Sequence, residues 1–104
     1  MLSKQLEAFR LKVAKFPDNL LYRFSFAQQL SAHGKSEEAI EHLEICLAKR
    51  DDWMIPFLLK AKLEISLDRK LEAISSLKKT IELAKAQSHD DPLVEAQELL
   101  DSLI

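Results

Sequence analysis

The sequence predicts an all-α protein in which antiparallel helical hairpins stack into a short solenoid of about six helices. The main observation is an internal repeat, because the segment at residues 36–43 matches the segment at 70–77 after a spacing of 34 residues. The register also holds upstream, from Ala27 to Ala61, without an insertion. The second observation is composition. One glycine and three prolines among 104 residues are too few for the turns of a sheet.

Apolar residues at intervals of three and four predict a first helix over about residues 3–16. Its apolar stripe consists of Leu2, Leu6, Phe9, Val13 and Phe16. Pro17 ends this helix, and Asp18 or Asn19 can cap a second helix that runs to about His33. Gly34 then falls where a tight turn between helices needs a left-handed backbone.

The rest of the chain continues the same pattern of helices and breaks. Ser36 is expected to cap a third helix that lasts to about Arg50, and Pro56 is expected in the first turn of a fourth. Asp68 marks the break before a fifth helix, and a sixth is expected over about residues 92–103. The third and fifth helices carry equivalent apolar stripes. These stripes are Ala39, Ile40, Leu43, Cys46 and Leu47 in the third helix, and Ala73, Ile74, Leu77, Thr80, Ile81 and Ala84 in the fifth.

These residues give the chain a resemblance to the tetratricopeptide repeat (TPR) family, whose 34-residue unit is a helical hairpin. The first copy matches with Pro17-Asp18-Asn19, Phe26-Ala27, Leu30, Gly34, Glu38-Ala39-Ile40, Leu43 and Cys46-Leu47. The second copy matches with Phe57, Ala61, Glu72-Ala73-Ile74, Leu77 and Thr80-Ile81. Departures occur at Arg23, where a large aromatic residue is usual, and at Lys60, Glu64 and Asp68. Lys60 and Glu64 are four residues apart and are expected to pair on an exposed face.

The resemblance implies a single domain with the fold of a short right-handed TPR-like solenoid. Residues 1–17 would be an N-terminal half-repeat helix, 20–53 the first repeat, 54–87 the second repeat and 91–104 a C-terminal capping helix. The sequence leaves open whether the chain is a whole protein or a piece of a longer array.

The resemblance also implies that the concave face, lined by the first helix of each hairpin, binds a protein or peptide partner. Helical spacing assigns to this face Leu21, Phe24, Gln28, Ser31, Ile55, Leu58, Lys62 and Ile65. Such a groove is mostly apolar and suits a segment with large side chains. The alternative is a structural or oligomerisation module, whose groove is covered by its own C-terminal helix or by a second copy in a homodimer.

Trp53 is included in this candidate face because it begins a helix at the mouth of the groove, where an amphipathic ring can anchor a partner. The alternative for Trp53 is that it packs between hairpins. The family's clamp for a C-terminal carboxylate uses several Lys, Arg and Asn residues, and Phe24 and Gln28 do not match it.

Composition argues against several other classes of function. A net charge of −2 gives no clustered basic face for nucleic acid, and no apolar run is long enough to span a membrane. A single cysteine and the lack of a secretory signal favour the cytoplasm. His42 and Cys46 share a helix face with the spacing of half a metal site or of a thiolate–imidazole pair. A metal site needs more ligands and Cys46 lies in the buried stripe, so we expect a non-enzymatic protein without a cofactor.

Overall fold

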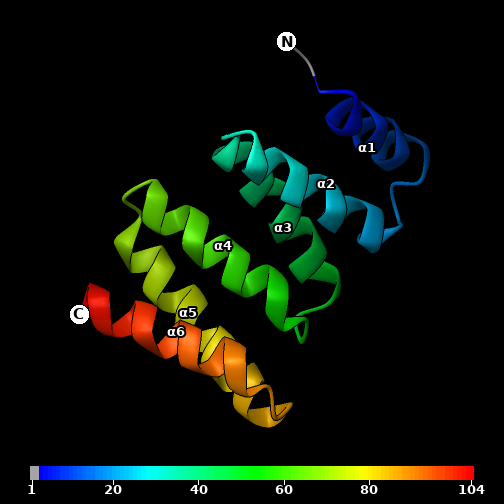
Figure 1. Ribbon diagram of the computed structural model, residues 1–104. Coiled ribbons are helices and arrows are strands. Elements are labelled where there is room, and N and C mark those ends of the chain that lie inside the picture. The colour runs from blue at the N-terminus through cyan, green and yellow to red at the C-terminus, as the bar shows by residue number, and fades with distance from the viewer. Residues whose placement is uncertain (1–2) are drawn as a thin grey trace. The chain divides into compact units, whose positions relative to one another are not determined.

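The computed structural model describes residues 3–104, and these residues form six α-helices and no strand (Figure 1). The helices are α1 (Lys4–Lys15), α2 (Leu20–Ala32), α3 (Ser36–Lys49), α4 (Met54–Ser66), α5 (Lys70–Ala86) and α6 (Asp90–Leu103). The connections have three or four residues each, so consecutive helices can pack as antiparallel neighbours. The predicted all-α class and the number of helices are confirmed. No helix among the described residues is long and apolar enough to cross a membrane.

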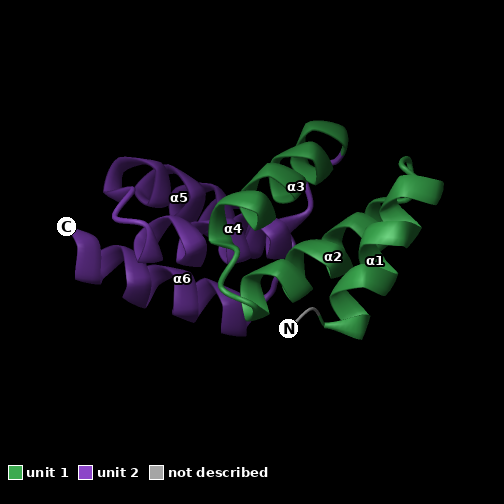
Figure 2. Cartoon of the chain, turned by 90° about the horizontal axis from the view of Figure 1, so that it is seen from above, with its two compact units in different colours: residues 1–49 green, residues 50–104 purple. Residues whose placement is uncertain are grey.

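The chain divides into two compact units, residues 1–49 and residues 50–104 (Figure 2). In the first unit α1 packs against α2, and α2 packs against α3. In the second unit α4 packs against α5, and α5 packs against α6. Each unit therefore contains one of the two expected hairpins, α2–α3 or α4–α5, and one additional helix.

The helix starts agree with the sequence patterns except at two positions. The Asn19 side chain accepts a hydrogen bond from the Tyr22 amide at 3.0 Å, as expected for the cap of α2. Ser36, however, is the first residue of α3 rather than its cap, because the Ala39 amide already donates to the Lys35 carbonyl. The sixth helix begins at Asp90 rather than at residue 92. A proline is accommodated in the first turn, where amides have no helical partner, so Pro92 does not define the start.

Each of the turns after α2, α4 and α5 uses one residue in the left-handed region. These residues are Gly34, with φ of 74°, and Asp68 and Ser88, both with φ of 58°. In each turn the next amide donates to a carbonyl five residues back, for example from Lys35 to Leu30 at 2.9 Å. This closure satisfies a carbonyl at the helix end. The prediction for Gly34 is confirmed, and Asp68 adopts the same conformation 34 residues later.

Small residues allow the helices of each hairpin to approach closely, as the repeat pattern predicted. Ala27 and Ala39 in the first hairpin, and Ala61 and Ala73 in the second, are fully buried. The first apolar stripe agrees in part, since Leu6 and Val13 of α1 are buried and Phe9 is half-buried. Phe16 is an exception, because it is exposed beside Tyr22, with 5.8 Å between ring centres. Leu2 lies outside the described residues.

The predicted pairing of Lys60 with Glu64 is present, but the expectation that it lies on an exposed face is wrong. Lys60 Nζ is 2.7 Å from Glu64 Oε2, and the Glu64 side chain is buried against α5. Ser76 of α5 completes the group, since its hydroxyl donates to Glu64 Oε1 at 2.7 Å and lies 3.3 Å from Lys60 Nζ. This polar triad therefore lies inside the α4–α5 hairpin.

Candidate functional site

The candidate residues of the first unit lie on one side of α2. Leu21, Phe24, Gln28 and Ser31 follow each other at steps of three and four residues, so they share this side. Leu21 is 65% exposed, Gln28 is exposed, and Phe24 and Ser31 are half-buried. Since Phe26, Ala27 and Leu30 are buried on the opposite side, α2 presents these four residues where a partner can reach them.

The candidate residues of the second unit lie on α4 and are less exposed. Ile55 is 39% exposed and Lys62 is exposed, whereas Leu58 is buried and Ile65 is half-buried. Leu58 and Ile65 belong to an apolar cluster with α6. The α6 members of this cluster are Ala96, Leu99, Leu100 and Leu103. Lys62 forms an ion pair with Glu95 of α6.

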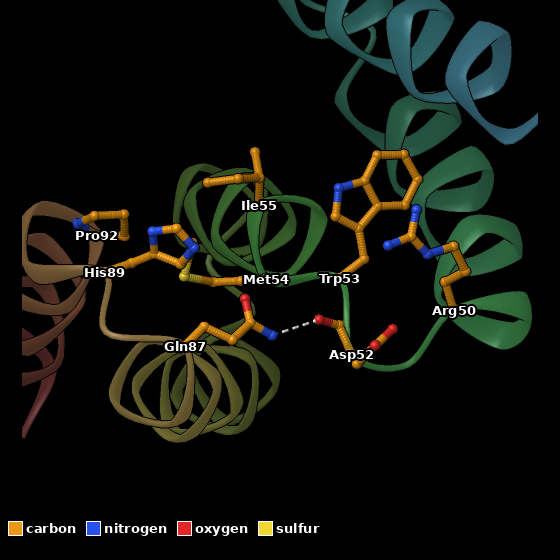
Figure 3. Close-up of a pocket in the computed structure, with 8 residues that line it drawn as sticks. All are labelled: Arg50, Asp52, Trp53, Met54, Ile55, Gln87, His89 and Pro92. Atoms are coloured by element: carbon orange, nitrogen blue, oxygen red, sulfur yellow. Dashed lines mark hydrogen bonds between the residues drawn. The ribbon is translucent and has the colours of Figure 1, made fainter.

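A pocket of about 610 Å³ lies in the second unit, where the starts of α4 and α6 meet the end of α5 (Figure 3). It is lined by Arg50, Asp52, Trp53, Met54, Ile55, Gln87, His89 and Pro92. Trp53 is half-buried, and the Arg50 guanidinium lies 5.0 Å from the centre of its ring. The Gln87 side chain donates to the Asp52 carbonyl at 2.9 Å, which ties the end of α5 to the start of α4. Trp53 and Ile55 therefore line a partly apolar pocket, and the Gln87–Asp52 hydrogen bond links two of its walls.

Sequence reasoning found Trp53 and Ile55 but missed the other residues of this pocket. Gln87, His89 and Pro92 are more than 30 residues away from Trp53 in the sequence, and only the packing of α5 and α6 brings them together. One sequence signal could have identified Gln87. It follows Trp53 by one repeat length of 34 residues, and Trp53 precedes α4 as Gln87 precedes α6.

His42 and Cys46 do not form a reactive pair. The Cys46 thiol is fully buried and lies 3.8 Å from the Leu20 carbonyl, and this burial raises the pKa of Cys46. His42 Nδ1 lies 2.9 Å from Arg23 Nη1, and because a guanidinium only donates, Nδ1 accepts this bond. Burial, and then the Arg23 charge, lower the pKa of His42. Both side chains therefore serve the α2–α3 contact.

The hydrogen bonds of Arg23 account for an arginine at a position where the repeat pattern usually has a large aromatic residue. Arg23 is buried in place of the usual aromatic residue, and its second terminal nitrogen donates to the Pro17 carbonyl at 3.0 Å. Glu38 completes the polar surroundings of His42, with Oε2 4.0 Å from His42 Nε2 and 2.9 Å from an Arg10 nitrogen. Among residues 3–104 no group of three His, Cys, Asp or Glu side chains is arranged to hold a metal ion.

Solved structures share this arrangement of helices. A protein of Bordetella parapertussis, solved in solution, is 19% identical and aligns with a TM-score of 0.83 over 99% of this chain and 89% of its own. A tetratricopeptide repeat domain protein from Salinibacter ruber aligns with TM-scores of 0.75 in solution and 0.76 in the crystal, at 24% and 23% identity. The chain has the fold of a tetratricopeptide repeat domain.

The Salinibacter ruber structures cover 84% and 83% of this chain, and the alignments include 88% and 96% of those proteins. No protein-family model and no curated protein matches the chain. At these identities the likeness concerns the TPR fold alone.

Proposed function

We propose that this TPR-like chain is a non-enzymatic scaffold that binds peptide or protein segments through apolar side chains, with one candidate surface on α2 in the first unit and another at the start of α4 in the second unit. The observation that carries the proposal is the pocket beside Trp53 and Ile55 (Figure 3). A volume of about 610 Å³ falls within the range of pockets that hold a compact ligand or a few side chains.

The chemistry of this pocket indicates what the segment would carry. Trp53, Ile55 and Pro92 offer apolar surface for one large aliphatic or aromatic side chain. Tryptophan and arginine are the residues that most often dominate binding energy at interfaces, and here Arg50 lies against the Trp53 ring. The Gln87–Asp52 hydrogen bond holds the pocket in shape before binding, which lowers the entropic cost of association.

The exposed side of α2 is a separate candidate surface, in the first unit. Leu21 and Phe24 are apolar, and Gln28 and Ser31 on the same side offer hydrogen-bonding groups. This combination suits an amphipathic or extended segment with apolar side chains at regular spacing. The proposal assigns no catalytic residue, because Cys46 and His42 are both engaged in the α2–α3 contact.

A second candidate is a structural module in which α6 occupies the face of α4. Two observations favour it: Leu58 and Ile65 share an apolar cluster with the α6 leucines, and Lys62 forms an ion pair with Glu95. On this view α6 takes the place of a ligand along the middle and end of α4. The start of α4 differs, because Ile55 remains exposed beside the pocket.

The two candidates are tested by selecting peptides from a displayed random library against the full chain. Trp53 is the only tryptophan, so its emission reports binding at the pocket directly. We expect selected peptides to share a large apolar residue and to shift this emission to shorter wavelength. Ile55→Ser should weaken binding about tenfold or more, since a buried aliphatic side chain contributes about 1.5–3 kcal/mol.

Leu71→Ser is the matched control, because Leu71 is an exposed apolar residue on α5 outside both surfaces. This variant should bind like the wild type. Equal loss in both variants would refute the assignment of the pocket. A selection that yields no binding peptide would favour the structural module.

A further inference from the structure

The exposed side of α1 forms a basic strip. Lys4, Ala8, Leu11 and Lys15 are all exposed and follow each other at steps of four, three and four residues, so they share one side of the helix. Leu11 at the middle of this strip is 69% exposed. The other side of α1 packs against α2 and contains the buried Leu6 and Val13.

The exposed side of α6 forms an acidic strip with a similar arrangement, charged residues at its ends and an apolar residue between them. Asp91, Val94, Glu98 and Asp101 are exposed and follow each other at steps of three, four and three residues. Val94 near the middle is 51% exposed. The buried Ala96 lies on the side that packs against α5, and α6 contains five acidic residues and no basic one.

The two strips are complementary in length as well as in charge. At the α-helical rise, Lys4 and Lys15 are separated by about 16 Å along α1, and Asp91 and Asp101 by about 15 Å along α6. In an antiparallel pairing the two ends of the strips would meet, Lys15 with Asp91 and Lys4 with Asp101. The apolar centres would then face each other.

We propose that α1 of one copy of this chain docks antiparallel against α6 of a second copy, with Leu11 against Val94. An antiparallel pairing also places the negative end of the α1 dipole beside the positive end of α6. A parallel pairing would align the two dipoles and is disfavoured. The contact joins two different surfaces, which belong to different units (Figure 2). Formed reciprocally, with α1 of each copy on α6 of the other, it closes a two-fold dimer; formed head to tail, it leads to rings or to open chains of copies.

This contact uses a different surface from the one in the proposed function, so the two can fail separately. A single pair of helices buries less than the area of a typical stable interface, so association is expected at high protein concentration and low salt. Raising the salt from about 20 mM to about 500 mM shortens the Debye length severalfold and should return the chain to its monomer mass of 11.9 kDa.

Sedimentation equilibrium of the full chain and two charge-reversed variants tests the proposal. The α1 variant carries K4E, K12E and K15E, and Lys12 is included because it is exposed beside the strip. We expect this variant to remain monomeric at a concentration where the wild type associates. Its apparent dissociation constant should rise at least tenfold.

The α6 variant carries D91K, E98K and D101K and should also remain monomeric by itself. A mixture of the two variants should associate again, because each then meets a partner of opposite charge. The helix content from far-ultraviolet circular dichroism and a cooperative thermal melting curve check that each variant is folded.

The control variant carries K70E, K78E and K85E on α5, three exposed lysines outside both strips. It has the same net charge as the α1 variant and should associate like the wild type. The proposal would be overturned by a wild type that stays monomeric at about 1 mM in low salt, where a weak interface is populated. A mixture that remains monomeric, or a control that dissociates as strongly as the α1 variant, would overturn it equally.

Discussion

Replacing Lys60 by methionine should destabilise the protein strongly, because the change leaves a buried carboxylate with a single partner. The Glu64 side chain is only 1% exposed, whereas Lys60 is 18% exposed. In Lys60→Met the carboxylate keeps only the Ser76 hydroxyl at 2.7 Å. Breaking a buried pair from one side costs about 3–5 kcal/mol, and partial access of water to Lys60 places the expected loss near about 3 kcal/mol.

The reverse change should cost less. In Glu64→Leu the lysine that remains can turn its ammonium group towards water, so we expect a loss of about 1–2 kcal/mol. The double variant Lys60→Met, Glu64→Leu should lie within about 1 kcal/mol of the wild type, since well-packed apolar residues often replace a buried ion pair without loss. The first hairpin supports this expectation, because Phe26 and Leu30 occupy the same repeat positions and are buried there.

Urea denaturation followed by circular dichroism and by Trp53 emission measures these three free energies of unfolding. A loss of about 3 kcal/mol corresponds to a fall in Tm of about 12–24 °C for a domain of this size. The coupling energy of the pair should be about 3 kcal/mol or more. A Lys60→Met variant that loses less than about 1 kcal/mol, the scale of an exposed pair, would refute the reasoning. A double variant no more stable than Lys60→Met would do the same.

Three further outcomes are expected. The pKa of His42 is lowered in the folded state, so the free energy of unfolding should fall as the pH drops below about 6.5, where the unfolded chain begins to take up that proton. Urea titrations between about pH 7.5 and about pH 5 should show this slope, and His42→Gln should remove most of it. Gly34→Ala should cost about 1–2 kcal/mol from backbone strain alone, because a Cβ at this position would meet no atom of the described residues within 4 Å; a cost near zero in thermal melting would contradict the left-handed turn. The buried Cys46 thiol of the folded protein should react with a disulfide reagent about a thousandfold more slowly than the thiol of the urea-unfolded chain, since reaction requires unfolding. A fast reaction of the folded protein, measured by absorbance, would show that α2 and α3 separate locally.

Helical periodicity predicted most of the fold because it depends on residues close together in the chain. The stripe of α3, four of the six stripe residues of α5 and the left-handed Gly34 follow from spacing and from the lone glycine, while Ile74 and Ile81 of α5 are only half-buried. The start of α6 was predicted two residues late, because a proline is compatible with several first-turn positions. Ser36 was assigned as a cap on residue type alone, while the chain path makes it the first helical residue.

Burial of polar residues could not be predicted in the same way. The spacing of Lys60 and Glu64 shows that they share a side of α4, but not which helix covers that side. The same limit applies to Leu58, which spacing assigned to an open face and which packs in a cluster with α6. The binding roles of the nine candidate residues remain predictions.

The sequence by itself determined that the chain is built of helical hairpins with a 34-residue register, because helix period, caps and turn residues act over one or two turns of chain. Only the tertiary structure decided which sides of those helices are available. Packing of α6 beside α4 and α5 buries Leu58 and leaves Ile55 exposed, and it assembles the Trp53 pocket from residues more than 30 positions apart. Accessibility depends on the neighbouring helices, and no local pattern records which neighbour covers a given side.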